Sequence, residues 1–138
     1  MAWYLCTISS GAKKNWDLCK DSKTWGILTL GGYASKDRAR RDDNLLFWLG
    51  GRGYVGHAKV IENTRPPLSP KEVPWLGGQE RYGLVIPLEE VKEFSTPTML
   101  KFVNRRQEIT GIDQSFFQRG YMPITDSIAN KILDLNSQ

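Results

Sequence analysis

The sequence is poor in the residues from which most catalytic and metal sites are built. It contains one histidine, His57, and two cysteines, Cys6 and Cys19, in 138 residues. Two cysteines without a CxxC spacing cannot build a disulfide framework or a zinc site, and they suit a reducing compartment. General-base catalysis by a histidine also needs an orienting partner and a nucleophile, so a structural role is favoured for His57.

The motifs of several large enzyme classes are missing as well. There is no GxSxG, no HExxH and no Walker-type phosphate loop. The glycine-rich run GGRGYVG leads into a predicted strand, so it lacks the helix N-terminus of a phosphate cradle. The neighbouring acids Asp42 and Asp43, like Glu89 and Glu90, point apart on a strand and form no acid/base pair. The sequence therefore argues against an enzyme and indicates neither a cofactor nor a metal.

No signal for membrane insertion or secretion is present. No apolar run approaches the roughly 18 residues that a membrane span needs. The first residues, MAWYLCTISSGAKK, lack the basic start and long apolar segment of a signal peptide. We therefore expect a cytoplasmic protein with no membrane partner. The length of 138 residues predicts one domain spanning residues 1–138, monomeric in isolation.

Hydrophobic patterning predicts short strands mixed with short helices. Alternation over residues 2–9 indicates a buried strand, and residues 10–25 contain a short helix with Trp16 and Cys19 on one face. Two apolar runs around GGRG predict a hairpin over residues 44–63. Further along we expect a long proline-rich connection over residues 64–79, a strand ending near Pro87, a short helix from Thr96 and a closing helix capped by Thr125 or Asp126. This order predicts an α+β domain built on a curved or barrel-like sheet of about five to six strands.

The basic residues are grouped along the chain. The net charge is +4, which permits a polyanionic partner without requiring one. The simplest interpretation is that each group lies on a solvated surface and has no specific partner. The alternative is contact with nucleic-acid phosphates, and the residues that we predict for it are Lys13, Lys14, Arg38, Arg40, Arg41, Arg52 and Arg105.

Aromatic residues provide the positive signal for a function. Five tryptophans occur in 138 residues, spread over five segments. Trp3 and Trp16 are expected in the core, whereas Trp25, Trp48 and Trp75 fall at strand ends or in a loop. Large aromatics at such places suit the faces of a flat heteroaromatic ring, and each base–aromatic stack contributes about 1–3 kcal/mol. The alternative is that Trp48 and Trp75 merely cap the open end of a barrel.

The order and spacing of several motifs resemble a known family, the EVE domains, which are similar to YTH domains and belong to the PUA-like superfamily. The resemblance covers nearly the whole chain. It rests on an opening strand, a short helix followed by a Trp-Gly step, two strands of a hairpin and a closing segment: WYLCTIS, NWDLCKDSKTWGI, RRDDNLLFWL, GYVGHAKVIEN and SFFQRGYMPITDSIANKIL.

The resemblance implies a reader of modified bases. Members of these families hold a methylated or otherwise modified base in an aromatic cage, either flipped out of a duplex or in single-stranded RNA. The resemblance places Trp25 at the main cage position, with Trp75 as a second wall and Trp48 in the aromatic slot at a strand end. Ser9 or Ser10 would then contact the edge of the base. The family's YHS-like run is FWLGG here, which puts any contact by that His and Ser in doubt.

These observations predict a nucleic-acid-binding module that recognises a modified base in DNA or RNA. It is either free-standing or the N-terminal targeting module of a modification-dependent nuclease. One alternative is a PUA-like RNA-binding accessory domain without preference for modified bases. Another is a small amidohydrolase like the ASCH relatives, for which Lys59, Glu62 and Thr64 would have to converge.

Overall fold

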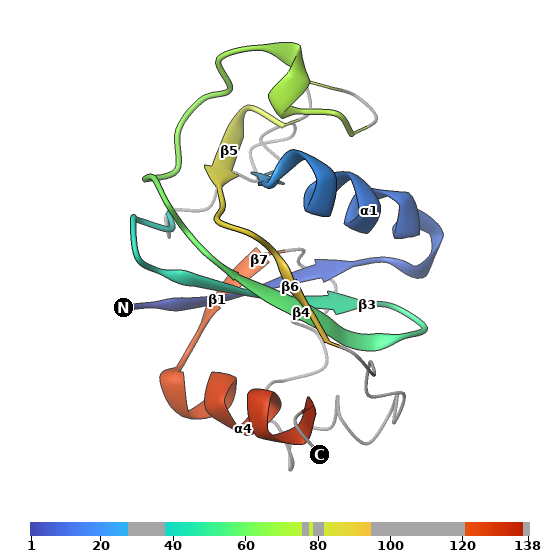
Figure 1. Cartoon of the computed structure of the whole chain (residues 1–138), viewed down its shortest axis with the longest axis vertical. Helices are drawn as coiled ribbons and strands as arrows, with labels where there is room; N and C mark the ends of the chain where they lie inside the picture. The colour runs from blue at the N-terminus through green and yellow to red at the C-terminus, as the bar shows by residue number, and fades with distance from the viewer. Residues whose placement is uncertain (28–37, 76–77, 79–81, 95–120, 137–138) are drawn as a thin grey trace.

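The computed structural model describes residues 1–27, 38–75, 78, 82–94 and 121–136. These residues form an α+β fold with a five-stranded mixed sheet, ordered β6-β4-β3-β1-β7, and a two-stranded sheet, β2-β5. Figure 1 shows α1 and β5 on one side of the larger sheet and α4 on the other. The α+β prediction is confirmed, and the strands of the described residues form an open larger sheet that does not close into a barrel. The helix predicted from Thr96 lies outside the described residues.

The larger sheet is centred on two parallel strands. Strand β1, Trp3–Ile8, runs parallel to β3, Asn44–Leu49, from the pair Trp3–Asn44 to the pair Ile8–Leu49. The predicted hairpin is present, because β4, Gly53–Lys59, pairs antiparallel with β3. The short strand β6, Lys92–Glu93, extends the sheet beside β4, and β7, Tyr121–Ile124, extends it beside β1.

The connection after β1 is helical and ends in a sharp turn. The 3₁₀ helix η1, Ser10–Ala12, leads into α1, Lys13–Ser22, which buries Trp16 and Cys19 against the sheet. Burial raises the pKa of both cysteine thiols, Cys6 and Cys19, so neither is a reactive thiolate near neutral pH. Helix α1 ends at Lys23, whose backbone is left-handed and whose N–H donates to the carbonyl oxygen of Cys19.

A second, smaller layer covers one face of the sheet. Strand β2, Thr24–Ile27, follows α1 directly and pairs antiparallel with β5, Leu84–Pro87. Between them in sequence, Arg65 forms an isolated bridge with Val85, and the 3₁₀ helix η2, Pro70–Glu72, interrupts the proline-rich connection. This arrangement brings the chain around residues 65–75 next to β2 and β5.

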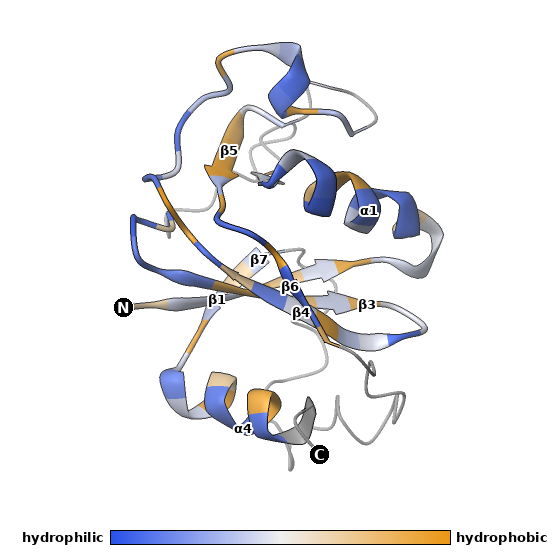
Figure 2. Ribbon diagram, viewed as in Figure 1, coloured by the Kyte–Doolittle hydropathy of each residue, from blue (hydrophilic) through white to orange (hydrophobic). Residues whose placement is uncertain are grey.

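The closing helix covers the opposite face. Helix α4, Asp126–Asn136, is capped by Thr125, whose hydroxyl oxygen accepts a hydrogen bond from the N–H of Ile128 at 3.2 Å. Ile132 is fully buried in a cluster with Leu5 and Leu46. Figure 2 shows apolar and polar residues alternating along both helices, as expected for elements with one buried face.

Candidate functional site

The tryptophans lie on two different faces of the five-stranded sheet. Trp25 packs in the cluster under α1 and β2, together with Phe47. Trp48 follows Phe47 on β3, so it points to the other face, where it packs against Tyr54 with ring centroids 4.9 Å apart. The structure therefore does not bring Trp48 together with Trp25, and any role for Trp48 in base binding would need a separate surface.

Trp25 and Trp75 do meet, and we call them the indole pair. Their ring centroids are 6.4 Å apart and the ring planes are inclined by 67°, so the edge of one ring meets the face of the other. Phe47 lies edge-on to Trp25 at 5.5 Å, and Tyr82 lies 5.3 Å from Trp75. Two inclined rings form a corner and not a parallel slot, so a flat ligand would stack on one indole and touch the edge of the other.

The two indole N–H groups differ in their hydrogen bonding. The Nε1 atom of Trp75 donates to the carbonyl oxygen of Asn15 on α1, over a long distance of 3.4 Å. The Nε1 atom of Trp25 is buried and has no acceptor among the described residues. A buried donor without a partner costs about 1–3 kcal/mol. Trp25 therefore presents a hydrogen-bond donor that a ligand could satisfy.

Gly26 allows the loop carrying Trp75 to pack on β2. A Cβ atom at this position would lie 2.8 Å from Cζ3 of Trp75 and 2.8 Å from Cδ1 of Tyr82. Real Cβ contacts are essentially never that short, so any larger residue would push the aromatic rings away. The Trp-Gly step noted in the sequence thus has a packing reason, because Trp75 and Tyr82 occupy the space that a side chain at position 26 would need.

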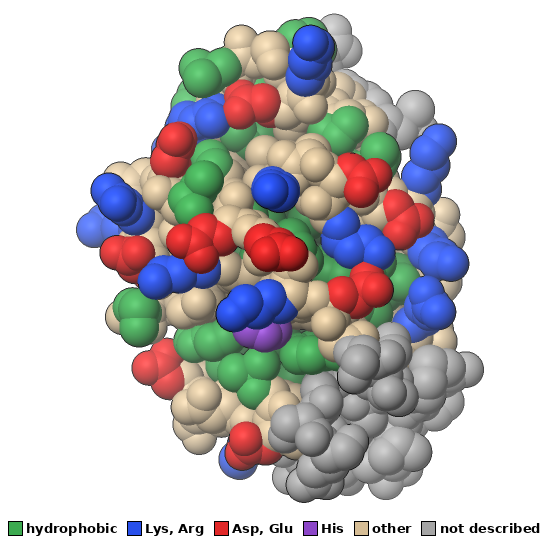
Figure 3. All heavy atoms as spheres, in the orientation of Figure 1, with side chains coloured by type: hydrophobic (Ala, Val, Ile, Leu, Met, Phe, Trp, Pro, Cys, Tyr) green, Lys and Arg blue, Asp and Glu red, His purple; other side chains and the backbone are tan. Residues whose placement is uncertain are grey.

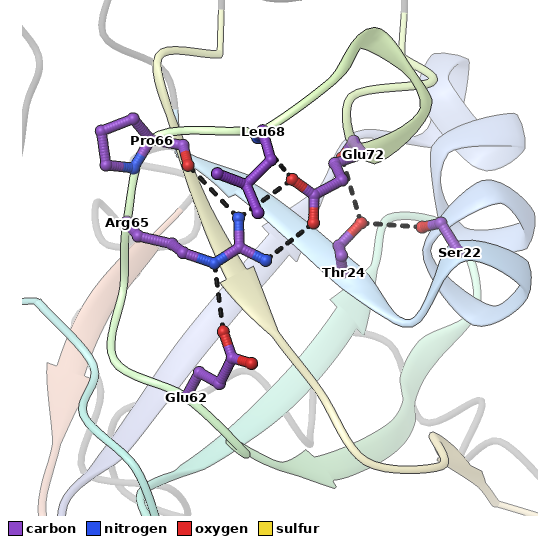
Figure 4. Close-up of polar contacts among 7 residues, drawn as sticks. All are labelled: Ser22, Thr24, Glu62, Arg65, Pro66, Leu68 and Glu72. Atoms are coloured by element: carbon purple, nitrogen blue, oxygen red, sulfur yellow. Dashed lines mark hydrogen bonds and ion pairs between the residues drawn. The ribbon is translucent and has the colours of Figure 1, made fainter.

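A polar network holds the connection that leads to Trp75 (Figure 4). The guanidinium of Arg65 donates two hydrogen bonds to the carboxylate of Glu72, at 2.9 and 2.7 Å. Its Nε donates to Glu62 at 3.1 Å and its Nη1 to the carbonyl oxygen of Pro66 at 3.2 Å. The Glu72 carboxylate also accepts the N–H of Leu68 at 2.6 Å. These bonds lower the pKa of Glu72 to about 2, mainly through Arg65 and then through Leu68.

One group of the predicted contact residues gathers at the carboxyl ends of β1 and β3. Ser9 and Ser10 follow β1, and the turn after β3 lies against them, since a Cβ on Gly50 would be 2.9 Å from the nitrogen of Ser10. Ser9 and Ser10 are exposed, and Gly50 is half-buried. The nearby cations Lys13, Lys14 and Arg52 are also exposed. Ser9 and Ser10 therefore lie beside exposed basic residues at this end of the sheet.

A second basic group lies at the other end of these strands. Arg38, Arg40 and Arg41 precede β3 and are exposed. The buried carboxylate of Asp43 accepts hydrogen bonds from the N–H of Arg40 at 2.8 Å and of Ala2 at 2.9 Å, which shapes this turn. The two ends of a six-residue strand are roughly 17 Å apart. The sequence did not indicate that the predicted phosphate contacts would divide into two separate groups.

None of these six described cations takes part in the ion pairs found among the described residues; those pairs involve Lys20, Lys59 and Arg65. The side chains predicted to meet phosphates are therefore not neutralised by acids in this part of the chain. Arg105 lies outside the described residues. On the face drawn in Figure 3, basic and acidic side chains are interspersed, so that face carries no large area of one sign.

The three residues considered for hydrolysis do not converge. Lys59 pairs with Asp42 at 3.7 Å, Glu62 binds Arg65, and the Thr64 hydroxyl donates to the carbonyl oxygen of Ala39 at 2.8 Å. Within the described residues, no three His, Cys, Asp or Glu side chains come together as a metal site requires. No helix in that part of the chain is long and apolar enough to span a membrane.

Several residues around the indole pair were not singled out from the sequence. Phe47 could have been found, because strand alternation puts it on the same face as Leu45. Tyr82, Asn15, Arg65 and Glu72 carried no such signal. Their contacts join segments that are up to 60 residues apart, as for Asn15 and Trp75.

Comparisons with known proteins establish the fold. No known family profile matches the sequence, and no curated protein matches it. Among solved structures, a hypothetical protein from Leishmania major has a TM-score of 0.64 and 20% identity, over 99% of this chain and 95% of that chain. The Mmi1 YTH domain in complex with RNA has a TM-score of 0.62 and 12% identity, over 99% of this chain and 77% of that chain.

A third similar structure is human THYN1 in complex with DNA that contains 5-methylcytosine. Its TM-score is 0.60 and its identity 15%, over 100% of this chain and 99% of that chain. At identities of 20% or less, these similarities show a shared fold and no more. The resemblance to EVE and YTH domains is thus confirmed at the level of the fold, which this chain shares with the Mmi1 YTH domain and with THYN1.

Proposed function

We propose that this chain is a nucleic-acid-binding reader that holds a modified base against the indole pair. The observation that carries the proposal is the buried Nε1–H of Trp25, which has no acceptor among the described residues. It lies beside Trp75 and Phe47, both of which offer aromatic surface. A base would complement both features, because it is flat and apolar on its faces, which suits stacking, and rich in acceptor atoms at its edge, which suits the N–H group.

The chemistry of the indole pair favours a methylated or hydroxymethylated base. A base stacked on one indole gains about 1–3 kcal/mol, and an acceptor on its edge would take the Trp25 N–H. A methyl group adds roughly 0.8 kcal/mol when it is fully buried in an apolar corner. Ser9 or Ser10 would contact the base edge from the end of β1. These gains offset the few kcal/mol needed to take a base out of a duplex.

Entry of the base requires movement at the indole pair. Trp25 and Trp75 are only 8% and 3% exposed. Trp25 lies within a paired strand, whereas Trp75 lies in the connection after η2 and is attached to α1 by a hydrogen bond of 3.4 Å. We therefore infer that Trp75 moves outward to admit the base and then returns to pack against it.

The basic residues would hold the phosphates on either side of the base. The two exposed groups lie at opposite ends of strands that are roughly 17 Å long, a length that corresponds to about five nucleotides at a rise of about 3.4 Å. Arginine suits this role because its guanidinium pairs with phosphate through two hydrogen bonds. Similar structures are described in complex with RNA and with DNA containing 5-methylcytosine, so both polymers belong in the test. Such a reader works either alone or as the targeting module of a modification-dependent nuclease.

The decisive experiment is a titration of short DNA and RNA oligonucleotides that carry N6-methyladenine, 5-methylcytosine, 5-hydroxymethylcytosine or no modification. We expect one modified oligonucleotide to bind more tightly than its unmodified counterpart at low salt. Trp25→Ala should abolish that preference. Trp3→Ala, a tryptophan on the opposite face of the sheet, is the matched control and should retain it.

Two results would contradict the proposal. Equal affinity for modified and unmodified RNA would instead support an RNA-binding accessory domain that does not distinguish modified bases. The absence of binding to every oligonucleotide at low salt would remove the nucleic-acid function altogether.

A further inference from the structure

Among the described residues, Arg65 is the only arginine that forms ion pairs within the protein. Its backbone is held by two hydrogen bonds with Val85 of β5, from Arg65 N to Val85 O at 3.0 Å and from Val85 N to Arg65 O at 2.7 Å. Its guanidinium lies against both oxygens of Glu72. A guanidinium that forms two parallel bonds fixes the orientation of its partner as well as its distance. Arg65 therefore ties η2 to the small sheet.

Glu72 is connected in turn to the strand that carries Trp25. Its backbone carbonyl accepts a hydrogen bond from the hydroxyl of Thr24 at 3.2 Å, and Thr24 immediately precedes Trp25. The hydroxyls of Ser22 and Thr24 are 2.9 Å apart. Because the single proton of Thr24 goes to a carbonyl oxygen, Ser22 is the donor in that second bond. Glu72 thus binds both β5, through Arg65, and β2, through Thr24.

Only two residues separate Glu72 from Trp75, and both restrict the chain. Val73 is 3% exposed and packs beside Trp75 and Val85. Pro74 has a fixed φ angle. A displacement at Glu72 therefore passes directly to Trp75, with little freedom in between to absorb it.

The pair is sheltered more than an ordinary surface ion pair. The side chains of Arg65 and Glu72 are 25% and 23% exposed, whereas that of Glu62, the second acid on Arg65, is 56% exposed. Exposed pairs contribute little because solvent and salt screen them. Glu72 should therefore matter more than Glu62, although both bind the same guanidinium.

We propose that Arg65 and Glu72 are positioning residues that hold Trp75 against Trp25 and so set how strongly the site prefers a modified base. The inference rests on the proposed reader function for its last step, but the placement of Trp75 can be tested without any nucleic acid. The two residues touch no base in this scheme, because they act through the position of the indole.

The first measurement needs no ligand. With 5-fluorotryptophan incorporated, the ¹⁹F resonance of Trp75, assigned by Trp75→Phe, reports its surroundings. We expect Glu72→Gln and Arg65→Lys to shift or broaden this resonance, with the signal of Trp3 unchanged. Glu62→Gln is the matched control and should leave it in place. The charge-reversed double variant Arg65→Glu with Glu72→Arg should restore it at least in part.

The second measurement is the ratio of affinities for a modified oligonucleotide and its unmodified counterpart. We expect Glu72→Gln to lower this ratio roughly three- to tenfold, while binding to the unmodified strand changes less. An unshifted Trp75 resonance in both single variants would overturn the inference. So would a shifted resonance with an unchanged affinity ratio. A wild-type protein that shows no preference at all would instead contradict the reader function, with the ¹⁹F result still deciding whether Arg65 and Glu72 position Trp75.

Discussion

The hydroxyl of Thr24 donates a hydrogen bond of 3.2 Å to the carbonyl oxygen of Glu72, 48 residues further along the chain. This bond joins the residue next to Trp25 to the short 3₁₀ helix that leads to Trp75. The contact between Trp25 and Trp75 is therefore supported by a hydrogen bond as well as by side-chain packing. Their supporting segments are bonded to each other, which makes the corner between them a defined structural feature.

Replacing Trp25 by phenylalanine separates the hydrogen bond from the aromatic surface. The variant keeps a ring but loses the N–H that has no acceptor among the described residues. We expect affinity for the preferred modified oligonucleotide to fall by about 1 kcal/mol, or roughly fivefold, because one hydrogen bond is lost. The free energy of unfolding should change by less than about 1.5 kcal/mol, since removal of a buried unsatisfied donor offsets part of the lost packing. Fluorescence anisotropy and urea unfolding measure the two effects.

Unchanged binding by Trp25→Phe would mean that the N–H does not contact the base. Trp75→Phe serves as a comparison. It removes the hydrogen bond to Asn15 as well as aromatic surface, so it should weaken folding and binding together.

Gly26→Ala should displace the ring of Trp75, which packs on the backbone of β2 at this position. The added Cβ would lie 2.8 Å from both Trp75 and Tyr82, and overpacking of this kind typically costs about 1–3 kcal/mol of stability. Modified-base preference should fall with it, because the ring is displaced. Gly11→Ala is the control, since nothing lies within 4 Å of a Cβ at that exposed position. Equal melting temperatures for the two variants would show that β2 can accommodate the methyl group.

Removal of exposed cations should weaken binding to all sequences alike. Each lost phosphate contact lowers the slope of log K against log salt by roughly 0.9 for duplex DNA and 0.7 for single strands. We expect reduced slopes for Lys13→Ala with Lys14→Ala and for Arg40→Ala with Arg41→Ala, and an unchanged ratio of modified to unmodified affinity. Lys131→Ala, on α4 at the far side of the sheet, should retain the wild-type slope. A slope that is the same in every variant would place the phosphates elsewhere.

Acid should destabilise the fold through Glu72. Its pKa is lowered from 4.5 to about 2, mainly by the hydrogen bonds from Arg65. A lowered carboxyl pKa stabilises the folded state fully above pH 4.5, and this contribution is lost as the pH falls toward 2. The free energy of unfolding, measured in urea between pH 2 and 5, should fall less steeply for Glu72→Gln than for the wild type. Parallel curves would mean that the pair contributes nothing to stability.

His57 should stay neutral to lower pH than a free histidine. Its ring lies between Trp3 and Phe94, and burial, with a smaller effect of Lys92, lowers its pKa. The unfolded chain therefore takes up the proton first, and stability declines as the pH falls below about 6.5. An NMR titration of the ring should give a midpoint below 6.5 that rises in Lys92→Gln. His57 contacts residues on the face of the sheet opposite to Trp25. The affinity for oligonucleotides should therefore not change when His57 is protonated.

Much of the fold was predictable because local patterns matched the final structure. Strand alternation over residues 2–9, the GGRG hairpin and the closing helix were each confirmed. Trp16 was correctly expected in the core, and Cys19, three residues further along the same helix face, is buried with it. Alternation also separates Phe47 from Trp48, although the faces to which they belong become clear only when the sheet is assembled.

The candidate site was predictable only in part. The loop position of Trp75 suggested exposure, but tertiary packing on Gly26 leaves this tryptophan 3% exposed. The basic residues were identified one by one from the sequence, yet their division into two groups follows from the parallel pairing of β1 and β3. The long-range bonds of Arg65 and Glu72 could not have been inferred from spacing.

The sequence by itself determined which segments become strands and helices and which residue types are present for stacking and for phosphate contact, because periodicity and composition act locally along the chain. Only the tertiary structure decided that Trp25 meets Trp75 and not Trp48, and that the N–H of Trp75 has an acceptor whereas that of Trp25 has none among the described residues. Those outcomes depend on which distant segments pack together, and the free energy of that packing is shared among contacts that no short stretch of sequence contains.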